Sequence, residues 1–145
     1  MDFEKQRFPV LLRGAWFGIN KAFRRKLETI SITPVQYTVL RNLIEGEGRV
    51  LRQQSLADSL STNKNNLADL LARMEEKRLI KRHENTKDQR YKSVSITQKG
   101  VQEFLQARKH ALALQGEILS LFNKKEQDLL LSYFDRCNDR LEEIS

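Results

Sequence analysis

The stretch from Arg52 to Thr97 limits the fold more than any other part of the chain, because two helical patterns are followed directly by a two-stranded one. The first pattern places Leu56, Ala57 and Leu60 on one stripe and is too short to be stable alone. The second has a narrow apolar stripe made of Leu67, Leu70, Leu71 and Met74. The two stripes can cover each other, which leaves the N-terminal turn of the second helix facing outward.

This outward turn is rich in polar side chains. Residues 61–66 read STNKNN, which supplies helix caps together with several amides and a cation. Side-chain amides can pair with base edges and a lysine can reach a phosphate, so the turn is suited to contact with DNA. An ordinary capped surface helix is the alternative interpretation.

Two extended segments follow around a polar turn. The first is charged between Lys81 and Glu84, the turn falls at residues 85–88, and the return segment alternates in polarity from Lys92 to Ile96 with the period of a strand. A charged ribbon placed after a polar-tipped helix can straddle a phosphate backbone or enter a minor groove. Together the segments predict a winged helix-turn-helix.

Five motifs, taken in order, resemble one known family. They are TPVQYTVL at 33–40, LADLLARMEEK at 67–77, LIKR at 79–82, DQR at 88–90 and ITQKG at 96–100. Their types and their order are similar to those of the multiple antibiotic resistance regulator (MarR) family. The resemblance is collinear over most of the chain, and its specificity lies in the order of the pieces rather than in any single piece.

The resemblance implies a homodimeric bacterial transcription regulator, most simply a repressor, whose second motif helix enters the major groove. By the same resemblance Arg90 would enter the minor groove, Asp88 would hold the wing in shape, and Arg73 would lie near DNA. The chain departs from the family at two positions. Arg78 stands where glycine is usual, so a left-handed helix end there would cost about 1 kcal/mol. Arg52 stands where Ser or Thr usually caps the first motif helix.

The residues expected to face DNA fall into two groups. Base edges would be read by Thr62, Asn63, Lys64, Asn65, Asn66 and Asp69, and phosphates or the minor groove would be contacted by Arg73, Arg82, Arg90 and Lys92, with Asp88 supporting the wing. A winged-helix module that binds a protein without specific DNA binding is the rival interpretation.

Positive charge is concentrated on this region. Residues 1–48 hold 8 Lys and Arg against 5 Asp and Glu, residues 49–99 hold 12 against 6, and residues 100–145 hold 6 against 8. The balances of +3, +6 and −2 add up to the net charge of +7. Such a local excess favours double-stranded DNA as the partner, whereas a basic solvated surface is the alternative.

The overall class follows from length and composition. A chain of 145 residues is long enough for one core, and only 2 prolines and 6 glycines argue against disorder or an all-β fold. We expect a mainly α fold with a small β wing and about six helices. Residues 33–99 would form the DNA-binding region, and residues 1–32 plus 100–145 would form dimerisation helices. Without a membrane-length apolar run or a signal-peptide layout, a cytoplasmic, nucleoid-associated protein is expected, with no membrane partner.

Local signals predict where the remaining elements begin. Thr33 and Pro34 are typical of a helix start, the glycines of 45–49 would end that helix, and Val50–Leu51 would add a third short strand. A long helix is predicted from Phe8 to Ile30 and another after Thr97. Asn123 and Glu126 have the spacing of a capping box, so a final helix should begin at Lys124.

The terminal helices carry more apolar surface than a small winged core can cover, which predicts a second copy of the chain as partner. The residues expected in the dimer interface are Phe8, Leu12, Leu130, Phe134, Cys137 and Leu141. A lone cysteine on such a stripe is expected to pack rather than to act as a redox sensor. If the family's ligand pocket is present, a small aromatic effector would lie near Trp16, Phe23 and Tyr37.

The sequence contains no set of residues typical of a catalytic site or a metal site. One cysteine and 2 histidines suggest neither a zinc site nor a Cys/His dyad, and no phosphate-binding glycine loop or nucleophile elbow occurs. We therefore expect no catalytic site, no metal and no cofactor.

Overall fold

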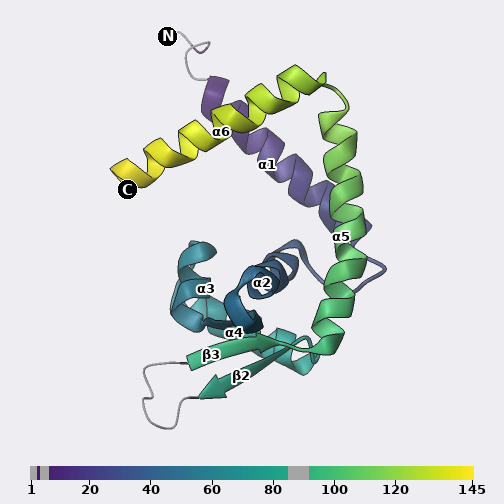
Figure 1. The fold of residues 1–145 in the computed structure, drawn as a ribbon, viewed down its shortest axis with the longest axis vertical. Coiled ribbons are helices and arrows are strands. Elements are labelled where there is room, and N and C mark those ends of the chain that lie inside the picture. The colour runs from purple at the N-terminus through teal and green to yellow at the C-terminus, as the bar shows by residue number, and fades with distance from the viewer. Residues whose placement is uncertain (1–2, 4–6, 85–91) are drawn as a thin grey trace. The chain divides into compact units, whose positions relative to one another are not determined.

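The computed structural model describes residue 3, residues 7–84 and residues 92–145, which form two compact units, 1–110 and 111–145 (Figure 1). The elements are α1 (Arg7–Lys26), α2 (Pro34–Glu45), a 3-10 turn η2 (Glu47–Arg49), β1 (Val50–Arg52), α3 (Gln53–Ser59), α4 (Lys64–Glu76), β2 (Ile80–Glu84), β3 (Lys92–Ile96), α5 (Gln98–Leu119) and α6 (Lys124–Ile144). The predicted mainly helical fold, with six α-helices and a small sheet among the described residues, is confirmed.

The sheet has the order β1-β3-β2, with both pairs antiparallel. Val94 lies opposite Leu51 on one side and Arg82 on the other, and it is fully buried at the centre of the sheet. The third strand predicted at Val50–Leu51 is therefore present. It closes one edge of the wing, which a two-stranded hairpin alone would leave weakly held.

The core of the first unit lies between the helices and this sheet. Most of its fully buried side chains come from α2, α3, α4 and the strands, and the turn residues Leu27 and Leu79 add two more. Those from the helices and strands include Val39, Leu40, Leu43, Leu56, Leu67, Leu71, Met74, Ile80 and Val94. Three of the four residues of the predicted α4 stripe are in this set, and Leu70 is half-buried. The stripe fixes the rotation of α4 about its own axis and turns its polar face to solvent.

Helix α2 begins as its sequence predicts. The Thr33 hydroxyl accepts the Gln36 amide at 3.2 Å, and the Thr33 amide donates to Gln36 Oε1 at 3.1 Å, which makes a capping box with Pro34 at the first helical position. Helix α3, by contrast, begins after Arg52 without a side-chain cap bond. The absence of Ser or Thr at position 52 therefore leaves the start of α3 without a side-chain cap, as the sequence predicts.

Helix α1 ends at Lys26, four residues before the predicted end at Ile30. The Ile30 amide donates to the Leu27 carbonyl at 2.9 Å in a tight turn, and Ser31 then adopts a left-handed φ of 64°. Apolar spacing continues through this turn because Leu27 is buried in it, although the backbone is no longer helical. Periodicity alone does not reveal such an end.

Helix α4 ends in the left-handed turn expected at position 78. Arg78 has a φ of 60°, its amide donates to the Glu75 carbonyl at 2.9 Å, and the Leu79 amide donates to the Met74 carbonyl at 3.0 Å. An arginine therefore occupies a conformation that glycine adopts with less strain.

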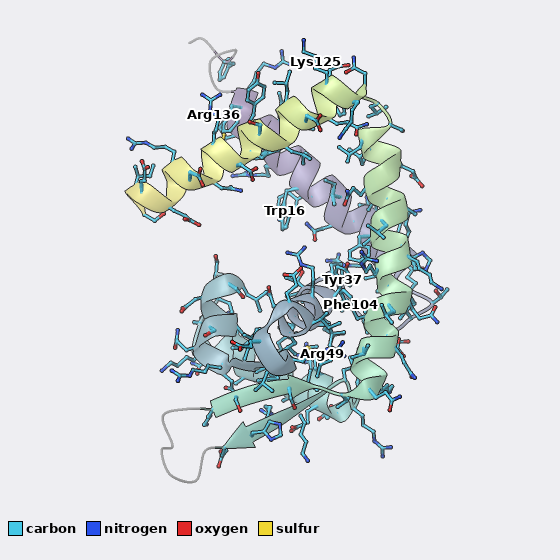
Figure 2. All side chains as sticks on the ribbon, viewed as in Figure 1. Trp16, Tyr37, Arg49, Phe104, Lys125 and Arg136 are labelled. Atoms are coloured by element: carbon cyan, nitrogen blue, oxygen red, sulfur yellow. The ribbon has the colours of Figure 1, made fainter. Side chains whose placement is uncertain are left out.

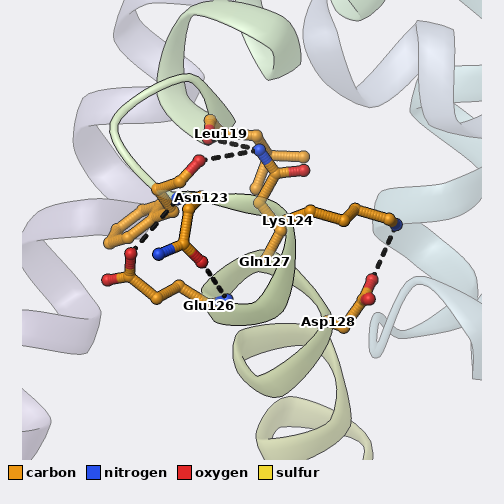
Figure 3. A network of polar contacts seen from close by, with 7 residues as sticks. Leu119, Asn123, Lys124, Glu126, Gln127 and Asp128 are labelled. Carbon is orange, nitrogen blue, oxygen red and sulfur yellow. Dashed lines mark hydrogen bonds and ion pairs between the residues drawn. The ribbon is translucent and has the colours of Figure 1, made fainter.

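The second unit consists of the end of α5 and the whole of α6. The predicted capping box is present, because Asn123 Oδ1 accepts the Glu126 amide at 2.9 Å and the Asn123 amide donates to Glu126 Oε1 at 3.2 Å (Figure 3). Gln127 Nε2 also donates to the carbonyls of Leu119 and Phe122, at 2.8 Å and 3.0 Å, and so ties the connecting turn to α6. Helix α6 buries none of its residues within the single chain.

Among the described residues, no helix combines the length and the apolar content that crossing a membrane requires.

Candidate nucleic-acid interface

The outward face of α4 gathers most of the residues predicted to read bases. Lys64, Asn65, Asn66, Asp69 and Arg73 are all exposed, and Thr62 is half-buried just before the helix. Asn65 and Asp69 lie at helical spacing on the side opposite the buried stripe, and Asn66 and Arg73 lie beside it. The first turn also exposes backbone amides at the positive end of the helix dipole, which favours a phosphate.

Asn63 has a structural role within this set. Its Oδ1 accepts the Asn66 amide at 2.9 Å and so caps α4. The acceptor atom of the side chain is used inside the protein, and its NH2 group is the part that can donate to a base. The bidentate pairing of an amide with adenine, which needs both donor and acceptor, falls instead to Asn65 or Asn66.

Arg82 is held by Glu75, a residue the sequence did not single out. Glu75 Oε2 accepts the Arg82 amide at 2.9 Å, and Glu75 Oε1 accepts Nε at 3.2 Å and Nη2 at 3.0 Å from the guanidinium. The backbone amide of Arg82 and then its guanidinium lower the pKa of the Glu75 carboxyl below its ordinary value. The contact ties β2 to the last turns of α4, so Arg82 helps to position the wing whether or not it contacts a phosphate.

The described part of the wing presents Lys92 at the start of β3, exposed and opposite Glu84 of β2. Asp88 and Arg90, to which the family resemblance gives the wing's roles, lie outside the described residues.

The residues expected around a ligand separate into two places. Phe23 meets Tyr37 edge to face, with ring centroids 5.0 Å apart. Tyr37 stacks on Phe104, with ring centroids 5.1 Å apart (Figure 2). Burial raises the pKa of the Tyr37 hydroxyl, and the nearby Arg41 opposes this effect. This cluster joins α1, α2 and α5 and fills the space between them. Phe104, which completes it, lies on the helix predicted after Thr97.

Trp16 lies in a different place, 65% exposed, two helical turns before Phe23 on α1. It borders a groove of about 420 Å³ between α1, α2 and α4, lined by Trp16, Phe17, Asn20, Arg24, Thr33, Pro34, Val35, Gln36, Leu70 and Arg73. Neither Phe23 nor Tyr37 is in this lining. The groove combines apolar walls with the guanidinium groups of Arg24 and Arg73, which suits a flat molecule carrying a negative charge.

The residues predicted for the dimer interface are accessible in the single chain. Phe8 is 64% exposed on α1, and Leu141 is 55% exposed on α6. Leu12 and Phe134 are exposed as well, and Leu130 and Cys137 are half-buried. In the described residues, no group of three or more His, Cys, Asp or Glu side chains could hold a metal ion.

Sequence reasoning missed Glu75 and the groove residues Val35 and Leu70 as members of a site. A signal existed for Gln36, because it stands three residues after Thr33 in the pattern of a capping box. The pairing of Glu75 with Arg82 is not visible in the sequence, since the two residues lie in different elements joined by the left-handed turn.

Comparisons with known proteins agree with this geometry. A model described as the MarR family matches residues 30–90. The transcriptional regulator HosA of Escherichia coli is 29% identical over 104 residues, which are 72% of this chain and 76% of that protein. The organic hydroperoxide resistance transcriptional regulator of Bacillus subtilis is 29% identical over 111 residues, 77% of this chain and 71% of that protein. The crystal structure of the S. aureus MepR–DNA complex superposes with a TM-score of 0.84 at 21% identity, covering 92% of this chain and 97% of that one.

Proposed function

We propose that this chain is a member of the MarR family of winged helix-turn-helix DNA-binding transcription regulators, that it binds a pseudo-palindromic operator as a homodimer, and that it represses transcription there. The observation that carries the proposal is the polar face of α4, which the buried stripe of Leu67, Leu71 and Met74 holds toward solvent. We refer to α4 as the recognition helix below.

Base reading is proposed for the first half of the recognition helix. Asn65 and Asn66 offer amide groups, and Lys64 places a cation at the N-terminal end, where a phosphate is also favoured by the helix dipole. Lys92 and Arg90 would contact the backbone or the minor groove. The excess of positive charge on residues 49–99 supports this division of the surface.

A homodimer is proposed because both ends of the chain leave apolar side chains exposed. The α1 side contributes Phe8 and Leu12, and the α6 side contributes Phe134 and Leu141. A two-fold axis would let identical patches cover each other, and it would place two recognition helices at successive turns of the major groove. Residues 33–99 would then contact DNA, and residues 1–32 with 100–145 would join the subunits, in the cytoplasm and on the nucleoid.

A small aromatic acid is proposed as the effector that releases the operator. Within the predicted set, Trp16 has the most suitable surroundings, because Arg24 and Arg73 line the same groove and can pair with a carboxylate. The groove touches α1 and the recognition helix, so a ligand that prefers one spacing of these two helices would shift the equilibrium toward it. Phe23 and Tyr37 would act from the neighbouring aromatic cluster.

Selection of bound sites from a random duplex pool tests the DNA-binding proposal. We expect enrichment of inverted half-sites whose centres are about one helical turn, roughly 34 Å, apart. A variant with Lys64→Ala and Asn65→Ala, both exposed, should fold normally and enrich nothing. If the unmodified protein enriched no sequence and showed no salt-dependent binding to random duplex, the chain would be a protein-interaction module instead.

The effector proposal needs its own measurement. Calorimetry with a panel of phenolic acids should show binding that Arg24→Ala weakens and that lowers affinity for the selected site. Binding to the panel without any change in DNA affinity would contradict a regulatory role for the groove.

A further inference from the structure

We propose that Lys77 is a positioning residue that clamps the C-terminal end of the recognition helix to both junctions connecting the DNA-binding region with α1 and α5. The first junction is the turn from Leu27 to Ile32, and the second is the passage from β3 into α5 at Thr97. This inference deepens the proposed function and rests on it, because its consequence is a fixed geometry for reading two half-sites.

The side chain of Lys77 holds the first junction. Its Nζ donates to the Ser31 carbonyl at 2.7 Å and to Gln36 Oε1 at 3.3 Å. Ser31 has a left-handed φ of 64°, a conformation that costs energy in a non-glycine residue and persists only where its surroundings hold it. Gln36 is 4% exposed, and the same Oε1 accepts the Thr33 amide. One ammonium group therefore supports both the strained turn and the buried cap of α2.

The backbone around Lys77 holds the second junction. Lys99 Nζ donates to the Lys77 carbonyl at 2.8 Å, and the Thr97 hydroxyl donates to the Arg78 carbonyl at 2.6 Å. The Thr97 amide donates to the Leu79 carbonyl at 3.1 Å. A Cβ on Gly100 would lie 2.2 Å from the Leu79 carbonyl oxygen, so only glycine allows α5 to pass this close.

These contacts give a role to the motif at 96–100, which has no proposed contact with DNA. Thr97, Lys99 and Gly100 all meet the turn at residues 77–79. The carbonyls of Met74 and Glu75 are bonded within the C-terminal turn of α4 itself. The three carbonyls that follow the helix, at 77–79, are bonded from Thr97 and Lys99. The two junctions thus converge on one turn, and the recognition helix cannot rotate against α1 or α5 without breaking several of these bonds.

The consequence on DNA concerns spacing rather than base choice. In the proposed dimer, α1 and α5 connect the two recognition helices, so a firm clamp makes the protein intolerant of a changed distance between half-sites. Inserting one base pair at the centre of the site moves the half-sites by about 3.4 Å and about one tenth of a turn. Lys77 would therefore contribute to selectivity for spacing without touching a base.

The test compares Lys77→Met with the unmodified protein on the selected site and on the same site with one central base pair added. We expect the unmodified protein to lose at least about tenfold in affinity on the longer site and Lys77→Met to lose about threefold or less. Base preference within each half-site should be unchanged. If Lys77 also contacts a phosphate, loss of that contact weakens binding to both sites equally and so leaves the ratio of the two affinities unchanged.

Two further variants separate positioning from charge. Lys77→Arg keeps a donor within reach of the Ser31 carbonyl and should restore most of the spacing selectivity. Lys125→Met removes the same charge from an exposed position of α6 and should leave the ratio at its original value. An unchanged ratio in Lys77→Met, or an equal change in Lys125→Met, would overturn the proposal.

Hydrogen exchange of the free homodimer tests the clamp without DNA. In Lys77→Met the Thr33 amide should exchange at least about tenfold faster, while the Leu71 amide in the middle of α4 keeps its rate. Equal acceleration of both amides would indicate simple loss of stability and would contradict a local clamp. If the unmodified protein enriched no duplex at all, the proposed function would fail and this exchange measurement would still decide the clamp.

Discussion

Helices α4 and α6 both carry a regular apolar stripe, yet they use it differently. Helix α4 buries Leu67, Leu71 and Met74 within its own chain, whereas α6 buries nothing and leaves Phe134 and Leu141 open to solvent. The winged region is therefore packed within its own chain, whereas the stripe of α6 would be covered only in the proposed dimer. A stripe in the sequence reports that a face will be covered, but not whether the cover comes from the same chain.

The largest effect is expected from charges placed on α6. Phe134→Glu combined with Leu141→Glu should dissociate the proposed dimer and largely unfold it, because burying two unpaired carboxylates costs several kcal/mol or more. Sedimentation and circular dichroism at micromolar concentration measure both effects. Asp139→Ala, on an exposed residue of the same helix, serves as control. A double variant that remained a folded dimer would place the interface elsewhere.

The matching change in α4 is Leu71→Ala. Because this side chain is fully buried within one chain, its loss should lower the free energy of unfolding by about 2–5 kcal/mol and leave subunit affinity unchanged. Leu141→Ala should do the reverse and mainly raise the dissociation constant of the dimer. Urea unfolding and sedimentation of the two variants would show the contrast, which would be lost if Leu71→Ala cost less than about 1 kcal/mol.

Substitutions in the recognition helix and in the wing should weaken DNA binding in two distinguishable ways. Asn65→Ala should cost about 1–3 kcal/mol on the preferred site and relax base choice at one position of each half-site. Arg90→Ala is the comparison, since loss of a wing cation should weaken all sites and flatten the salt dependence. Affinities at several salt concentrations on single-base variants measure both. Intact base preference in Asn65→Ala would move base reading to another residue.

A smaller effect is expected at the end of α4. Arg78→Gly should raise the free energy of unfolding by about 0.5–1 kcal/mol, because glycine adopts the left-handed φ without strain. Arg78→Ala, which removes the side chain but keeps the strain, should give no gain. Thermal unfolding of both variants shows whether backbone strain or the arginine side chain has the larger effect on the free energy of unfolding at this turn.

The smallest effect concerns acid. The pKa of Glu75 is lowered in the folded protein, so its contact with Arg82 stabilises the fold above the ordinary carboxyl pKa, and this contribution is lost as the pH falls through the folded value. Glu75→Gln should therefore be less stable than the unmodified protein at pH 7, and the difference should shrink toward pH 3. Glu76→Gln removes an equal charge one residue away, outside the contact with Arg82. A constant difference between pH 3 and pH 7 would contradict the assignment.

The sequence predicted most reliably those features that are decided within a few residues. The helix start at Thr33 follows from a cap residue followed by Pro34, and the start at Asn123 follows from its cap and Glu126. The strand from Lys92 to Ile96 follows from its period of two. Each of these signals is local, so no knowledge of the rest of the fold was needed.

Features that depend on distant contacts were missed or misplaced. The early end of α1 goes with the left-handed Ser31, whose carbonyl is held by a lysine 46 positions later. Trp16 was grouped with Phe23 because both lie on one face of a helix, but seven residues separate them by about 10 Å along the axis. That distance is enough to put one side chain in the aromatic cluster and the other in the groove.

The bare apolar stripe of α6 also has a consequence for the amount of active regulator in a cell. In the proposed dimer, each newly made chain stays incomplete until it meets a second one, and the population of assembled molecules then grows with the square of chain concentration while unpaired chains predominate. Degradation would act mainly on the unpaired chains, whose surface is open. Halving synthesis would therefore remove more than half of the assembled protein, and gene expression under its control would respond steeply to its own dosage.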